Sequence, residues 1–172
     1  NIDINNGNFI YSFNKNSGEL SNLSIDIDSF QVNSGKIEFN STKDLLIQGN
    51  IQSDFNLDKK IFIKFFKDVN FNTYKNFSIR GDFKKSFIIK LDETLKVKDY
   101  NFKIDGELKK TLINLSKPIK VDFFSENLNS INFDKTFFKI DYSANNKNLL
   151  KTNGLYSLNN LEFQKFDSSL IF

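Results

Sequence analysis

The stretch Leu45-Leu46-Ile47-Gln48-Gly49-Asn50-Ile51-Gln52-Ser53-Asp54-Phe55-Asn56-Leu57 alternates apolar or small residues with polar residues along nearly its whole length. A period of two predicts a β-strand with one apolar face and one solvated face. The alternation recurs at residues 77–83 and 100–108, and weaker runs include Ile61-Ile63-Phe65. We therefore predict an all-β chain of roughly ten or more short strands in an antiparallel meander.

The composition removes most of the side chains that carry chemistry. The chain has 172 residues and a net charge of +3, with no Cys, His, Met or Trp. The absence of Cys and His excludes disulfides, thiolate nucleophiles, the common catalytic triads and the usual zinc ligands. We therefore predict a protein that is not an enzyme and has no catalytic residues, no metal site and no cofactor.

An internal repeat organises the middle of the chain. Residues 76–88 align without gaps on residues 101–113, with Gly81 matching Gly106, and looser copies occur at 45–51 and 150–156. We predict one β-hairpin per repeat, near 44–66, 76–98, 101–123 and 137–166, within a single segment (1–172) of a larger repeating domain. The dibasic pairs Lys84-Lys85 and Lys109-Lys110 are then expected at hairpin tips.

Each repeated glycine is expected on the apolar face, where it lets a strand coil or another group approach closely. Two arrangements follow from the pattern and stay open. The apolar faces pack on each other in a sandwich or closed solenoid, or an open, coiled sheet forms a groove that binds acyl chains through apolar area. The residues expected to line such a groove are Leu45, Ile47, Ile51, Phe55, Phe77, Ile79, Phe83, Phe102, Ile104 and Leu108.

The repeated glycine-centred strands, with Leu45-Ile47-Gly49-Ile51, Phe77-Ile79-Gly81-Phe83 and Phe102-Ile104-Gly106-Leu108, resemble the AsmA-like family, which includes the TamB and YhdP proteins. Residues 95–108 and 130–166, whose short strands are joined by Asn- and Lys-rich turns, are most similar to the YhdP type. The high Asn and Lys content departs from the family pattern. Members of the family form repeating β-grooves and have no catalytic residues to transfer.

The resemblance implies the second arrangement, an elongated antiparallel meander of β-hairpins coiled into an open, solenoid-like groove. It also implies a lipid-conducting segment of a protein that spans the periplasm of a Gram-negative bacterium and is anchored in its inner membrane. Such proteins are implicated in phospholipid transport to the outer membrane and in envelope biogenesis. The expected partners are phospholipid acyl chains and flanking repeats of the same chain, and membrane contact is expected only through parts outside this segment. The alternatives are a structural or adhesive β-solenoid of a surface protein and a jelly-roll module for lipopolysaccharide transport.

Nucleic acid is not expected among the partners. Lysines interleave with acidic residues along the chain, and Arg80 is its single arginine. A nucleic-acid-binding surface instead gathers basic side chains on one face and places aromatic rings beside them. Here the Phe residues alternate toward the apolar face, away from the charges.

Overall fold

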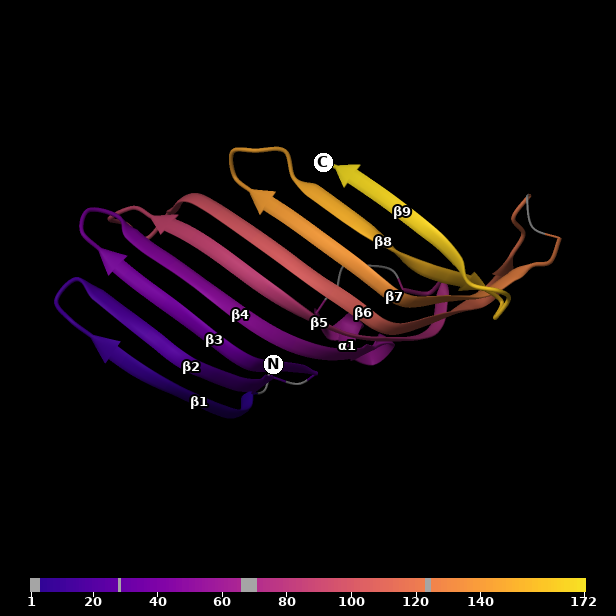
Figure 1. The fold of residues 1–172 in the computed structure, drawn as a ribbon, viewed down its shortest axis with the longest axis horizontal. Helices are drawn as coiled ribbons and strands as arrows, with labels where there is room; N and C mark the ends of the chain where they lie inside the picture. Colours follow the sequence, from indigo (N-terminus) through magenta and orange to yellow (C-terminus); the bar gives the residue numbers. More distant parts are fainter. Residues whose placement is uncertain (1–3, 28, 66–70, 123–124) are drawn as a thin grey trace.

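In the computed structural model, the chain forms one open sheet of nine antiparallel strands that follow each other in sequence order (Figure 1). The structure describes residues 4–27, 29–65, 71–122 and 125–172. The elements are β1 (Ile4–Phe13), β2 (Ser17–Ile27), β3 (Phe30–Ser41), β4 (Leu45–Asp58), α1 (Lys59–Phe65), β5 (Tyr74–Leu91), β6 (Val97–Ile119), β7 (Leu128–Ser143), β8 (Leu149–Leu158) and β9 (Gln164–Ile171). The predicted all-β class and antiparallel meander are confirmed, and of the two arrangements that the pattern left open the sheet has the open one.

Strand register assigns every paired residue to one of two faces, because directly opposed residues of antiparallel strands point the same way. Leu45 pairs with Leu91, Ile47 with Ile89, and Phe55 with Gly81. From β5 the same side continues through Phe87 paired with Phe102, and into β7 through Ile104 paired with Ile140. We call this side of the sheet the apolar face, and the side that carries Gln48, Asn50, Lys84 and Lys103 the polar face.

The sheet is a single layer, with α1 as the one helix among the described residues (Figure 1). The chain exposes 11952 Å² of surface, whereas a compact monomer of its mass exposes about 8,700 Å². Only four apolar side chains of the described residues are buried: Leu23, Leu57, Phe77 and Leu128. The sandwich and closed-solenoid arrangements are therefore wrong for the described part of the chain.

Glycines and large apolar side chains interlock across neighbouring strands on the apolar face. Gly49 lies between Ile37 and Phe87, and Gly106 lies between Phe83 and Phe138. A Cβ atom on Gly106 would lie 2.4 Å from the Phe138 ring and 2.6 Å from the backbone oxygen of Asp82. No glycine has a positive φ, so these residues supply room for a neighbour and not an unusual backbone conformation. The inward placement predicted for the repeated glycines is confirmed.

The dibasic pairs do not lie at hairpin tips, so that prediction is wrong. Lys84 and Lys85 lie within β5, paired with Asp105 and Ile104, and Lys109 and Lys110 lie within β6. In β5 the alternation runs through Lys84 and Lys85 without a turn residue, and in β6 the register against β5 shifts between Leu108 and Lys110 while the strand continues. Each copy of the 76–88 repeat therefore lies within one long strand and is not a hairpin, and the described residues form nine strands in place of ten or more shorter ones.

The ranges predicted for the hairpin repeats contain different elements. Range 44–66 holds β4 and α1, and range 76–98 holds most of β5 and the turn after it. Range 101–123 holds most of β6, and range 137–166 joins the end of β7 to β8 and the start of β9. The bounds 66 and 123 lie outside the described residues.

A helix replaces the strand predicted at Ile61-Ile63-Phe65. The Ile61 backbone N–H donates to Oδ1 of Asp58 over 2.9 Å, which makes Asp58 the cap of α1. An aspartate cap satisfies one of the N–H groups that the first helical turn leaves without a partner. The cap ends β4 and turns the chain onto the apolar face, where Phe62 meets Phe77.

We expect Gly106→Ala to lower the free energy of unfolding by about 1–3 kcal/mol, because the added methyl group overpacks against a backbone oxygen that cannot move aside. The matched control is Gly7→Ala in β1, where an added Cβ has nothing within 4 Å. Urea denaturation of both variants checks the prediction. Equal losses of stability would show that the glycine–aromatic interlock does not constrain the sheet.

Candidate functional site

The ten residues predicted to line a groove all lie on the apolar face. In β4 these are Leu45, Ile47, Ile51 and Phe55, and in β5 they are Phe77, Ile79 and Phe83. The β6 residues join the same face because Ile104 pairs with Lys85, Phe102 with Phe87, and Leu108 with Gly81. The strand registers thus bring the ten predicted positions together on one continuous surface.

One end of the apolar face is covered by α1. The Phe62 ring makes edge contacts with Phe77 at a centroid distance of 5.2 Å and with Phe71 at 5.5 Å. Phe77 and Leu57 are consequently buried, each with 8% of its surface exposed. One of the ten predicted residues, Phe77, therefore lies where the chain itself supplies a cover.

Away from α1, the apolar face carries aromatic rings, and no second layer formed by the described residues lies above them. Phe87, Phe102 and Tyr142 lie side by side across β5, β6 and β7, with centroids 6.3 and 6.4 Å apart, and Tyr100 stacks on Tyr142 at 5.3 Å. All four are only partly buried or are exposed. Offset rings at these distances stabilise one another and keep a flat apolar surface in place.

At the end of the sheet away from α1, the apolar face has a depression beside the β1–β2 turn. A depression of about 490 Å³ is lined mainly by apolar side chains, among them Tyr11, Phe13, Leu20, Phe39 and Leu45. Tyr11 and Phe13 are more than half exposed although they lie in a paired strand. Contiguous exposed apolar surface of this kind marks sites of binding.

Lys85 interrupts the apolar face at its middle. Its cross-strand partners are Ile51 and Ile104, and its Nζ lies 4.9 Å from the centre of the Phe102 ring and 5.7 Å from that of Phe87. No carboxylate of the described residues lies within ion-pair distance of this ammonium. Burial lowers the pKa of Lys85 below its usual range.

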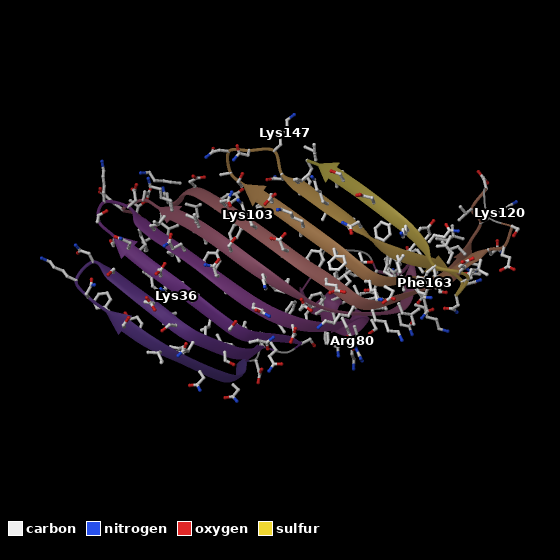
Figure 2. All side chains as sticks on the ribbon, viewed as in Figure 1. Lys36, Arg80, Lys103, Lys120, Lys147 and Phe163 are labelled. Atoms are coloured by element: carbon white, nitrogen blue, oxygen red, sulfur yellow. The ribbon has the colours of Figure 1, made fainter. Side chains whose placement is uncertain are left out.

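Several charges on the polar face form ion pairs. Lys36 contacts Glu38 at 2.8 Å and Glu19 at 3.1 Å, and these carboxylates raise the pKa of Lys36. Lys36 and Lys103 lie in one cross-strand row, with Asn50 and Ser86 between them (Figure 2). Exposed ion pairs of this kind contribute little to the free energy of folding. We therefore interpret the polar face as ordinary solvated surface.

One ion-pair cluster joins the β3–β4 turn to the β5–β6 turn. Asp44 accepts from Lys98 at 2.9 Å and from Lys90 at 3.0 Å. The Lys98 and Lys90 ammonium groups hold the pKa of the Asp44 carboxyl below its ordinary value. The two ion pairs connect the β3–β4 turn to the adjoining ends of β5 and β6.

Sequence reasoning missed Lys85 and the cover formed by α1. Extending the period of two from Phe77 through Ile79, Gly81 and Phe83 would have placed Lys85 on the apolar face. The alternation was not extended to Lys85 because Lys84 and Lys85 were expected at a hairpin tip. Asp58 directly before the Lys59–Phe65 segment was the signal for the helix cap.

The described residues contain no group of three or more acidic side chains arranged to hold a metal ion. In the same residues no helix is long and apolar enough to cross a membrane. The fold and its candidate site define a single-layer antiparallel β protein with one exposed apolar face.

No protein-family model matches the chain, and neither a curated protein nor a solved structure is significantly similar to it. The resemblance to the AsmA-like family is thus untested by these comparisons and stays a prediction.

We expect Lys85→Met to raise the free energy of unfolding by up to about 1 kcal/mol at neutral pH, because the part-buried charge is removed. The thioether keeps a favourable contact with the Phe87 and Phe102 rings, so the loss of the cation–ring attraction is largely compensated. Since the folded-state pKa of Lys85 is lowered, its charge destabilises the fold at low pH. The wild type regains stability as the pH rises through that pKa toward 10.5.

The advantage of Lys85→Met should therefore shrink as the pH rises, which urea denaturation at neutral and alkaline pH measures. Lys84→Met is the control, because Lys84 is the exposed neighbour on the polar face. A stability gain of Lys85→Met that does not change with pH would contradict the view that the charge of Lys85 destabilises the fold.

Proposed function

We propose that the chain binds the acyl chains of phospholipids along its apolar face and serves as one segment of an open lipid-conducting groove. The observation that supports this proposal most directly is that the apolar face extends from β1 to β9 and that, among the described residues, only α1 covers it. The protein is not an enzyme in this proposal, and its binding free energy comes from apolar area.

The side chains on the face suit flexible hydrocarbon. The interlocked rings and glycines form a continuous surface of Phe, Ile, Leu and Tyr that offers few directional hydrogen bonds. The backbone groups within the sheet already pair with each other, so a polypeptide has hydrogen-bonding edges to use only at β1 and β9. An acyl chain needs no such partners and can lie anywhere along the face.

The resemblance to AsmA-like proteins adds the wider setting. In that setting the segment belongs to a periplasm-spanning protein anchored in the inner membrane of a Gram-negative bacterium, and it takes part in phospholipid transport to the outer membrane. Flanking repeats of the same chain would continue the sheet at β1 and β9. The edge positions Phe13 and Leu170, which are 69% and 55% exposed, suit such continuation.

The test compares two isoleucines that are neighbours in β5 but lie on opposite faces. Ile89, between Ile47 and Tyr100, lies on the apolar face, and Ile88, between Gln48 and Asn101, lies on the polar face. We expect Ile89→Asp to lower bound phospholipid about tenfold, since a carboxylate covered by hydrocarbon is costly, while Ile88→Asp leaves it unchanged. Native mass spectrometry after incubation with phosphatidylethanolamine and phosphatidylglycerol vesicles measures the bound lipid.

Circular dichroism of each variant controls for folding. Ile104→Asp is less suitable for this purpose, because the new carboxylate would face Lys85 and pair with it. A wild type that takes up no lipid, or equal losses in both variants, would contradict the proposal. Either result would favour a structural or adhesive role for the sheet.

A further inference from the structure

We infer that Lys85 binds the phosphate group of a phospholipid whose acyl chains lie on the apolar face. This inference rests on the proposed function and adds the part of the ligand that the apolar side chains do not recognise. It assigns a charged contact to a surface that otherwise binds a ligand mainly through apolar contact area.

Lys85 is the single charged side chain among the paired, described residues of the apolar face in β3 to β7. On β4 it faces Ile51, between Gly49 and Ser53, and on β6 it faces Ile104, between Phe102 and Gly106. The acidic groups nearest in sequence to Ile104 and Ile51 are Asp105 and Asp54. They pair with Lys84 and Asp82 on the polar face.

The ammonium is therefore half-buried among hydrocarbon and rings without an anionic partner in the described part of the chain. Its aliphatic stem lies among apolar side chains, and its Nζ, with three N–H donors, lies 4.9 Å from the centre of the Phe102 ring and 5.7 Å from that of Phe87. Ring contacts supply only part of what an ion pair would. A ligand that brings an anion to this point gains a charge-assisted hydrogen bond in partly desolvated surroundings.

The apolar surface continues in both directions from Lys85 along β5. Phe83 and Ile79 follow toward α1, and Phe87, Ile89 and Leu91 follow toward the open end. A phospholipid matches this arrangement because it joins two apolar chains at one phosphate. The Lys85 ammonium complements the phosphate group, and the acyl chains cover the apolar side chains around Lys85.

The experiment is isothermal titration calorimetry of the full chain with three probes below their aggregation concentrations. The probes are dihexanoyl phosphatidylglycerol, the uncharged dihexanoylglycerol with the same acyl chains, and inorganic phosphate. We expect the wild type to bind the phospholipid about tenfold more tightly than the neutral lipid, which corresponds to about 1.4 kcal/mol. Inorganic phosphate alone should not bind.

Lys85→Met should lose this preference by binding the phospholipid about tenfold more weakly while its affinity for the neutral lipid stays the same. Lys84→Met carries the same change of charge on the polar face and should keep the preference. An equal loss in Lys84→Met would assign the effect to net charge and overturn the inference. Binding of phosphate alone through Lys85 would also overturn it, by showing an anion site independent of lipid.

The two proposals fail in different ways. If the wild type binds neither lipid, the lipid-binding function itself is wrong, and the role of Lys85 is wrong with it. If the wild type and Lys85→Met bind both lipids equally, acyl-chain binding stands and only the phosphate contact is overturned.

Discussion

The fold depends on the interlocking of glycines with large apolar side chains on one face of a single sheet. A one-layer sheet has no second layer to bury its side chains, so each strand must obtain its packing from its immediate neighbours. Phe87 over Gly49, Phe55 over Gly81 and Phe138 over Gly106 do this with ring contacts that leave no room for a Cβ atom. Aromatic cover of a glycine on the next strand is a known means of fixing strand register.

This packing explains why the surface is both ordered and available. The rings are held from the side by glycines and by small side chains such as Ser53, Thr111 and Thr136, each 3% exposed. Their outer faces stay open because nothing beyond α1 covers them among the described residues. Stability and the binding surface thus come from the same side chains, so a substitution here affects both unless it keeps the volume and the face.

The two faces of the sheet differ in how their charged side chains are compensated. Several charges on the polar face are paired along or across strands, as with Lys36 and Glu38 or Lys109 and Asp82. Among its paired, described residues in β3 to β7, the apolar face carries one charged side chain, Lys85. An unmatched charge within hydrocarbon is unfavourable unless something compensates it, and this makes Lys85 the most informative polar residue of the surface.

The sequence by itself determined the strand class, the antiparallel order and the face of each of the ten predicted residues. It could do so because a period of two is a local property of extended backbone. Only the tertiary structure decided that the sheet stays a single open layer, that α1 covers Phe77, and that Lys85 lies between Ile51 and Ile104. These depend on where turns fall and on which strands become neighbours. The two lysines taken alone do not separate a hairpin tip from the middle of a long strand, although the alternation that begins at Phe77 runs on to Lys85.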